Sequence, residues 1–200
     1  MSSEFLEARK ALRRELRARR RLLPAEMRAL AARRIASHVA RCFPFRPGQR
    51  VALYSPLPHE LDVAPLARLA RLHRCRIYLP RIIDRRKHRM SFVEARGALL
   101  PNRLGILEPR SARAISPRRL DLVFLPLVGF DASGMRLGMG GGYYDRAFAF
   151  LRLRTAWHRP KLIGLGFAMQ RVAALTRAPH DLHLDAVVTE EGVLRCRSGY

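Results

Sequence analysis

The chain has 200 residues, of which 48% are hydrophobic, so it can bury one sizeable core and we expect a single domain over residues 1–200. Its 39 Lys and Arg residues outnumber its 16 Asp and Glu residues, and a formal net charge of +23 would ordinarily suggest nucleic acid or an anionic membrane surface as a partner. The excess is smallest in residues 121–200, and a solvated Arg-rich surface is the alternative that needs no such partner. No apolar run approaches the ~20 residues of a membrane-spanning helix, and charged side chains occupy the region where a signal peptide has its apolar core, so we expect a cytoplasmic protein without membrane attachment.

The N-terminal part of the chain predicts two amphipathic helices. Residues 4–22 place apolar side chains at helical spacing among charged ones, and Pro24 separates this segment from a second helix at about 25–41. Short apolar runs and one further amphipathic segment follow. They predict a strand at 50–55, a crossover helix at 63–73, and strands at 76–80 and, less clearly marked, at 90–94.

The strongest signal for a buried strand is "LDLVFLP" at residues 120–126, a continuous apolar run that ends at a proline. A helix at about 142–153 and strands at 161–167 and 184–190 complete the pattern. Helices that alternate with strands imply a mostly parallel sheet that is covered on both faces. We therefore expect an α/β fold of three layers, Rossmann-like in its arrangement.

The stretch "RLGMGGGYYDR", from Arg136 to Arg146, holds four glycines and follows the predicted central strand after an expected loop around Gly129–Gly134. Ligands in open α/β sheets bind outside the carboxyl ends of the strands. A glycine-rich loop that leads into a helix also offers free N–H groups and a favourable dipole to an anion. The spacing matches neither Gly-x-x-x-x-Gly-Lys-Ser/Thr nor Gly-x-Gly-x-x-Gly, so the glycines alone leave a phosphate loop and an ordinary surface loop both open.

The side chains around these glycines favour a phosphate ligand. Arg136 and Arg146 flank the loop and can pair with phosphate oxygens, and Asp145 is a hard oxygen ligand suited to the Mg²⁺ that accompanies a nucleoside triphosphate. Tyr143 and Tyr144 suit stacking on a planar ligand, and their spacing equally suits packing at the start of a helix.

The longer segment "LPLVGFDASGMRLGMGGGYYDR" resembles the signature of the 5-formyltetrahydrofolate cyclo-ligase family, also called 5,10-methenyltetrahydrofolate synthetases. Other blocks resemble that family in the same order along nearly the whole chain. They are "RKALRREL" at 9–16, "VALYSPLPHELDV" at 51–63, "LGILEP" at 104–109, "IGLGFAMQ" at 163–170 and "PHDLHLDAVVTE" at 179–190. The resemblance implies an enzyme that uses MgATP to convert 5-formyltetrahydrofolate into 5,10-methenyltetrahydrofolate through a phosphorylated formyl oxygen, with release of ADP and phosphate.

The resemblance also implies roles for individual residues. The implied ATP-binding set is Arg9, Arg13, Arg136, Leu137, Gly138, Met139, Gly140, Gly141, Gly142, Tyr143 and Tyr144. The implied folate-binding set is Ser55, Glu60, Met139, Gly140, Gly141, Gly142 and Tyr143, and Glu60 would accept hydrogen bonds from pterin N–H groups. Asp145 and Asp181 correspond to ligands of Mg²⁺. We expect Arg136, Tyr143 and Asp145 to act in catalysis.

The sequence departs from the family pattern at a few positions. They are Arg9 in place of Lys, Val63 in place of Thr, Leu127 in place of Gly, Gly141 where many members have Lys, and Ala168 in place of a frequent acidic residue. The Arg keeps the charge but changes the donor geometry, and the glycine removes one cation from the loop. None of these changes removes the glutamate, the two aspartates or the tyrosine pair, so we expect an active enzyme.

Two other classes of function remain open from the sequence. The Arg-rich segment 9–21 and the net charge would suit an RNA-binding or ribosome-associated protein, although an aromatic content of 8% and the lack of a stacking motif argue against nucleic acid as a partner. A different nucleotide-binding α/β enzyme, or an inactive member of the family, is the second class. We expect a monomer or a weak dimer.

Overall fold

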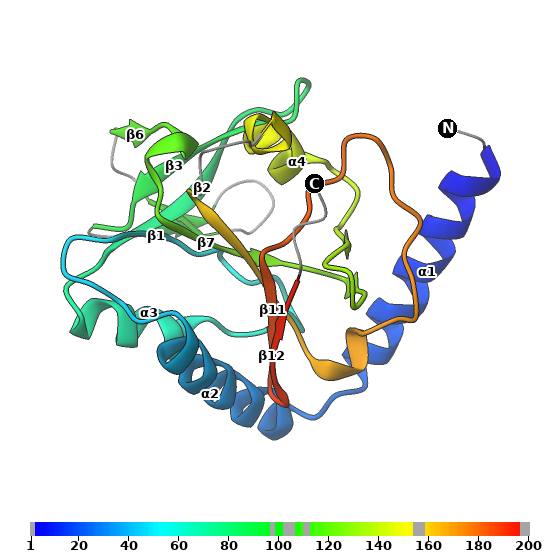
Figure 1. Ribbon diagram of the computed structural model, residues 1–200, viewed down its shortest axis with the longest axis horizontal. Coiled ribbons are helices and arrows are strands. Elements are labelled where there is room, and N and C mark those ends of the chain that lie inside the picture. Colours follow the sequence, from blue (N-terminus) through cyan, green and yellow to red (C-terminus); the bar gives the residue numbers. More distant parts are fainter. Residues whose placement is uncertain (1–2, 97–98, 102–106, 110–112, 154–158, 197–200) are drawn as a thin grey trace.

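The computed structural model describes residues 3–96, 99–101, 107–109, 113–153 and 159–196. An eight-stranded sheet crosses the centre of the molecule (Figure 1). Its strands lie in the order β12 (Gly192–Arg195), β11 (Ala186–Thr189), β10 (Lys161–Leu165), β7 (Leu122–Pro126), β1 (Arg50–Ala52), β2 (Arg76–Asp84), β3 (Arg89–Glu94) and β6 (Ala114–Ile115). The five strands from β11 to β2 are parallel, whereas β12, β3 and β6 are antiparallel at the two margins. The predicted α/β fold with a mostly parallel sheet is confirmed.

Side chains that alternate along the central strands divide the core between the two faces of the sheet. Phe124 of β7 belongs to the face that packs against α2 (Ala25–Cys42) and α3 (Ala64–Leu72). Its neighbour Val123 belongs to the other face, where it packs in a cluster with Phe148. Continuous apolar runs therefore form these strands because both of their faces are buried.

The second face is covered by shorter helices than the sequence predicted. The helix expected at 142–153 consists of α4 (Tyr143–Ala147) followed by the 3₁₀ helix η2 (Ala149–Leu153). The fully buried Phe148 lies at the break between them. Figure 1 shows α4 on the side of the sheet opposite α2 and α3. Because a five-residue helix has little macrodipole, an anion near this point would depend on loop N–H groups and side chains instead.

The first helix, α1 (Ser3–Arg21), runs along the side of the molecule instead of covering a sheet face (Figure 1). It buries only Leu16 and Arg20. Leu16 packs with Val128 and Leu137, next to the glycine-rich loop. Since so little of α1 is apolar, most of its arginines face solvent or the cavity described below.

Most elements begin and end within a few residues of their predicted positions, and the differences lie in short strands. The expected loop at Gly129–Gly134 belongs to a hairpin of β8 (Gly129–Phe130) and β9 (Arg136–Leu137). The other strands that were not predicted are β4 (Leu99–Pro101), β5 (Leu107–Pro109), β6 and β12. In the block at 104–109, positions 104–106 lie outside the described residues.

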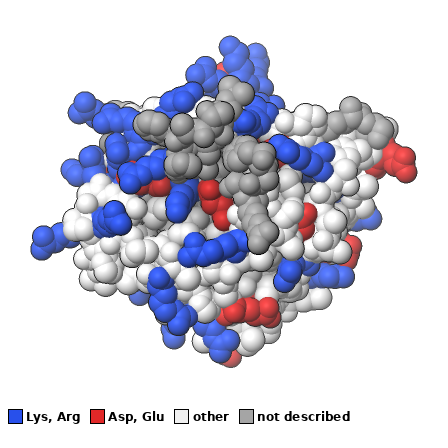
Figure 2. All heavy atoms as spheres, viewed as in Figure 1, with Lys and Arg blue, Asp and Glu red and all other residues white. Residues whose placement is uncertain are grey.

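The surface is strongly basic without a single basic patch on the face that Figure 2 shows. Lys and Arg side chains are spread over most of this face, and Asp and Glu side chains lie among them. Among the described residues, none of the helices has the length and apolar character needed to cross a bilayer.

Candidate active site

A cavity of about 530 Å³ lies next to Pro126, at the carboxyl end of the central strand β7. Its walls come from the first half of α1, the loop after β1, the glycine-rich loop and the segment 178–181. This volume is typical of small-molecule sites, which span ~300–1,000 Å³. The predicted site residues that line the cavity are Arg9, Arg13, Glu60, Arg136, Gly138, Met139, Gly140, Gly141, Gly142, Tyr143, Tyr144, Asp145 and Asp181.

Two predicted site residues, Ser55 and Leu137, do not line this cavity. The Ser55 hydroxyl donates a hydrogen bond to the carbonyl of Leu107 at 2.5 Å. The Leu137 side chain is fully buried with Leu16, and its carbonyl accepts a hydrogen bond from the N–H of Val128 at 2.7 Å. Their binding roles stay predictions, and the geometry offers no support for them because these groups already serve packing and local hydrogen bonds.

Sequence reasoning missed the apolar wall of the cavity. The residues concerned are Phe5, Leu6, Leu57, Ile82, Pro126, Leu127 and Ala178, together with His180. An apolar side chain carries no chemical signature of binding, because the same residue types fill the core. Four of them, Leu57, Pro126, Leu127 and His180, lie inside the resembling blocks, and only this position could have pointed to them.

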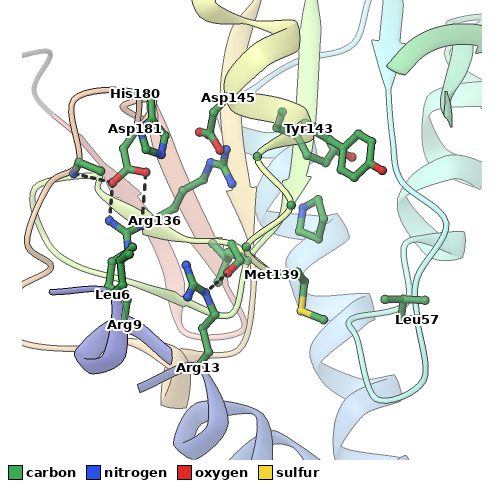
Figure 3. A pocket seen from close by; sticks show the side chains of 18 of the residues that line it. Leu6, Arg9, Arg13, Leu57, Arg136, Met139, Tyr143, Asp145, His180 and Asp181 are labelled. Atoms are coloured by element: carbon green, nitrogen blue, oxygen red, sulfur yellow. Dashed lines mark hydrogen bonds and ion pairs between the residues drawn. The ribbon is translucent and has the colours of Figure 1, made fainter. Parts of the chain in front are cut away.

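Arg9 joins α1 to the C-terminal part of the chain through a two-pronged ion pair with Asp181. Its Nη1 lies 2.6 Å from Oδ2 and its Nη2 lies 3.3 Å from Oδ1 (Figure 3). The N–H of Ala178 donates to the same Oδ2 at 2.8 Å. The planar guanidinium allows this two-pronged geometry, which a lysine ammonium group could not form.

Arg136 and Asp145 form a second ion pair across the start of α4. Arg136 Nη2 lies 2.7 Å from Asp145 Oδ1, which also accepts the N–H of Leu182 at 3.3 Å. The Arg136 side chain is only 5% exposed, and its buried Nε has no hydrogen-bond partner among the described residues. Such a donor is costly to bury unpaired, so the guanidinium of Arg136 would gain from an anion bound in the cavity that it lines.

Arg13 holds the glycine-rich loop from the side of α1. Its Nε donates to the carbonyl of Gly138 at 2.8 Å (Figure 3). Burial and the charge of Arg9 lower the pKa of Arg13, while Asp181 raises it. Three guanidinium groups, those of Arg9, Arg13 and Arg136, therefore lie at one end of the cavity, and the carboxylates of Asp181 and Asp145 pair with Arg9 and Arg136.

The glycines of the loop are needed for backbone shape and for space. Gly140 has φ +99° and Gly142 has φ +65°, values that other residues adopt only at a cost. A Cβ on Gly141 would lie 2.9 Å from the ring of Tyr143, which is closer than real Cβ contacts. The loop can therefore bring its backbone, without side chains, against a ligand in the cavity.

The opposite end of the cavity contains Glu60 and Leu57. Glu60 Oε2 accepts the N–H of Leu57 at 3.0 Å, and its Oε1 lies 3.7 Å from Nη1 of Arg20. Burial raises the pKa of Glu60, while the Leu57 hydrogen bond and the charge of Arg20 lower it. In Figure 3 Leu57 lies across the cavity from Asp181, so the two ends are well separated.

The described residues contain no group of three or more His, Cys, Asp or Glu side chains that would form a complete metal cage. Mg²⁺ at nucleotide sites needs only one or two carboxylates, because phosphate oxygens and water supply the other ligands. Asp145 fits this use, since both of its hydrogen bonds from described residues reach Oδ1 and leave Oδ2 for an ion. Asp181 fits less well because Arg9 occupies both of its oxygens.

Comparison with known proteins assigns the family. The sequence model of the 5-formyltetrahydrofolate cyclo-ligase family matches residues 6–190. The 5-formyltetrahydrofolate cyclo-ligase of Escherichia coli K12 is 34% identical over 186 residues, which cover 89% of this chain and 98% of that protein. The Haemophilus influenzae enzyme of the same name is 30% identical over 168 residues, 82% of this chain and 87% of that protein. The NMR structure of Aquifex aeolicus 5,10-methenyltetrahydrofolate synthetase has a TM-score of 0.79 at 29% identity and covers 96% of this chain and 94% of its own. This chain belongs to the 5-formyltetrahydrofolate cyclo-ligase family.

Proposed function

We propose that this chain catalyses the ATP- and Mg²⁺-dependent cyclisation of 5-formyltetrahydrofolate to 5,10-methenyltetrahydrofolate, with release of ADP and phosphate. The observation that carries the proposal is a single cavity with two chemically different ends. One end holds three arginines and two aspartates, and the other holds a buried glutamate. The glycine-rich loop lines the same cavity. Two substrates that present different chemical groups, a triphosphate and a pterin ring, can therefore meet over the loop.

The arginine end suits the triphosphate of ATP. Guanidinium groups pair with phosphate oxygens by strong charge-assisted hydrogen bonds, and the N–H groups of a side-chain-free loop add further donors. Arg9 and Arg136 are already oriented by Asp181 and Asp145, so little freedom is lost when a phosphate arrives. Mg²⁺ held by Asp145, when bound, would neutralise charge that develops on the phosphoryl group during transfer.

The glutamate end suits the pterin of the folate. An ionised carboxylate accepts hydrogen bonds and donates none, which matches the N–H donors along one edge of a pterin ring. Leu57, the 44% exposed Met139 and Tyr143 supply apolar surface for a planar ring. This arrangement would bind the folate at Glu60 and direct its formyl group toward the loop.

The chemistry requires the formyl oxygen to become a leaving group. Transfer of the γ-phosphoryl group to that oxygen releases ADP and leaves an imidate phosphate. The neighbouring folate amine attacks the formyl carbon and loses its proton, and phosphate departs with the C–O electron pair to leave the methenyl cation. The protein contributes position and charge stabilisation instead of covalent chemistry, which agrees with a site made of arginines, backbone and carboxylates.

The test is to mix the purified protein with MgATP and 5-formyltetrahydrofolate and follow the near-ultraviolet absorbance of the methenyl product. We expect absorbance growth matched by ADP release, and no ADP release when tetrahydrofolate without the formyl group replaces the substrate. No methenyl product would overturn the assignment. ADP release that does not depend on the formyl group would indicate a different nucleotide-using enzyme.

We also propose that the enzyme works in the cytoplasm as a monomer or a weak dimer. All three cysteines, Cys42, Cys75 and Cys196, are free thiols. Free thiols support a reducing compartment, because disulfides form and persist in oxidising ones.

A further inference from the structure

Arg20 approaches Glu60 from outside the substrate cavity. Glu60 lines the cavity whereas Arg20 does not, and the two side chains are only 5% and 6% exposed. The 3.7 Å between Arg20 Nη1 and Glu60 Oε1 is too long for a hydrogen bond. Among the described residues nothing accepts a hydrogen bond from Arg20 Nε, which is also buried. The pair is therefore electrostatic and only partly satisfied.

Stability alone does not explain why the fold buries such a pair. Removing two charges from water is costly, and a buried pair with imperfect geometry is often no better than two apolar residues of similar size. The Glu60 carboxylate has a use in the cavity, whereas Arg20 is not part of the cavity lining and faces a smaller neighbouring pocket. A role for Arg20 that is exerted through Glu60 accounts for both observations.

The charged groups that face Glu60 identify Arg20 as its main cation. Burial raises the pKa of Glu60, and Arg20 opposes this shift more than Arg17, the other arginine of α1 that acts on it. Tyr54 and Tyr144 also face this region, and burial raises the pKa of both hydroxyls, so both stay neutral. Burial lowers the pKa of Arg20 as well, but an arginine keeps its charge at any physiological pH.

We propose that Arg20 is a positioning residue that keeps the Glu60 carboxylate ionised and directed at the pterin of the folate. The proposal rests on the proposed function, in which Glu60 binds the folate. A protonated carboxyl group would place its own O–H against pterin donors and would accept fewer hydrogen bonds. Because α1 also carries Arg9 and Arg13, the same helix then prepares both ends of the cavity.

The sign of the pH effect follows from the direction of the shifts. Without Arg20, burial acts on Glu60 with less opposition, so its pKa moves further up toward neutral pH. The carboxylate is then lost as the pH falls through that raised pKa, and folate affinity is lost with it. The affinity for ATP, which binds at the other end, should change little.

The experiment compares wild type with Arg20→Met, which keeps an unbranched apolar stem and removes the charge. The dissociation constant of 5-formyltetrahydrofolate is measured without ATP from pH 6.0 to 8.5, and that of ATP is measured separately. For wild type we expect a change of less than about 3-fold in the folate constant across this range. For Arg20→Met we expect a rise of about 10-fold as the pH falls, since each pH unit below a pKa costs about tenfold. Arg20→Lys should largely restore the flat profile.

A double-mutant cycle separates an action through Glu60 from a direct contact with the substrate. If Arg20 works through Glu60, adding Arg20→Met to Glu60→Gln should change folate affinity by less than about 2-fold. The matched control is Arg19→Met, the same substitution on the same helix at a side chain that is 56% exposed and pairs with Glu15. This control should leave both affinities unchanged, because exposed pairs contribute little.

Three outcomes would overturn the proposal. The first is a flat pH profile in Arg20→Met with equal losses of folate and ATP affinity. The second is a folate loss of the same size with and without Glu60→Gln. The third is wild type that binds no 5-formyltetrahydrofolate at any pH, which would overturn the proposed function as well. If Arg20→Met does not fold, the comparison of Arg20→Gln, expected to be pH-dependent, with Arg20→Lys, expected not to be, decides in its place.

Discussion

At the scale of single residues, the two aspartates of the cavity differ in which of their oxygens are occupied. Asp145 accepts two hydrogen bonds from described residues, both on Oδ1. Asp181 accepts Arg9 on both oxygens and the N–H of Ala178 on one of them. We therefore expect Asp145 to bind Mg²⁺ directly and Asp181 to act mainly by orienting Arg9.

Substitution of each aspartate by asparagine should separate these roles. Asp145→Asn removes the charge that faces the ion, so we expect the Mg²⁺ concentration for half-maximal rate to rise by at least about 10-fold. Loss of a residue that only orients a metal ligand already costs about 10-fold in metal affinity. Asp181→Asn loosens Arg9, so we expect a weaker affinity for ATP and little change in the Mg²⁺ requirement. Initial rates against Mg²⁺ at saturating ATP measure the difference. Unfolding temperatures close to that of wild type confirm that both variants are folded.

Equal shifts in the Mg²⁺ requirement for the two variants would contradict this division of roles. It would then follow that Arg9 leaves Asp181 when the nucleotide binds, and that both carboxylates reach the ion together.

At the scale of elements, the glycine-rich loop and the turn at Gly48 offer a matched comparison. Gly140 and Gly48 both have positive φ, +99° and +76°, and neither has close neighbours around an added Cβ. Only Gly140 lines the cavity. An alanine at either position therefore meets similar backbone strain, but only one of the two lies where a ligand would approach.

Gly140→Ala and Gly48→Ala should destabilise the fold similarly, by about 1–2 kcal/mol, because each forces an L-residue into a left-handed conformation. Turnover should fall at least about 10-fold only in Gly140→Ala, where the methyl group points toward Arg13 and the loop moves away from its preferred shape. Chemical denaturation measures the first effect and the absorbance assay the second. Equal turnover in the two variants would mean that the loop backbone does not approach the phosphates.

The elements also show what the sequence could predict and why. Strong periodicity or a continuous apolar run marked α1, α2 and β7, and all three are present near their expected bounds. The strands β8 and β9 have two residues each and β12 has four, and segments this short carry no reliable period. The helix expected at 142–153 was too long because the buried Phe148 interrupts it, which depends on tertiary packing.

At the scale of the whole molecule, the site depends on contacts that no local pattern reveals. The residues of the glycine-rich loop could be predicted from the family signature, but their partners could not. Arg9 and Asp181 are 172 positions apart, and Arg20 meets Glu60 only because α1 lies beside the loop after β1. The resemblance implied ATP-binding roles for Arg9 and Arg13 but none for Arg20, and all three form buried or part-buried contacts around the cavity.

The net charge of +23 leads to a prediction for the whole surface. This net charge creates a long-range positive field, and on the face in Figure 2 the Lys and Arg side chains are spread out instead of gathered in one patch. Both ATP and 5-formyltetrahydrofolate are anions, and such a field raises the rate at which anions reach a cavity. The Debye length falls from ~30 Å at 0.01 M salt to ~10 Å at 0.1 M, so the field is largely screened over that range.

We expect kcat/KM for each substrate to fall by roughly 10-fold between these salt concentrations while kcat changes little. Measurements in NaCl and in potassium acetate at fixed free Mg²⁺ separate screening from the effect of a particular ion. A change of less than about 2-fold in kcat/KM in both salts would mean that the surplus charge does not guide the substrates.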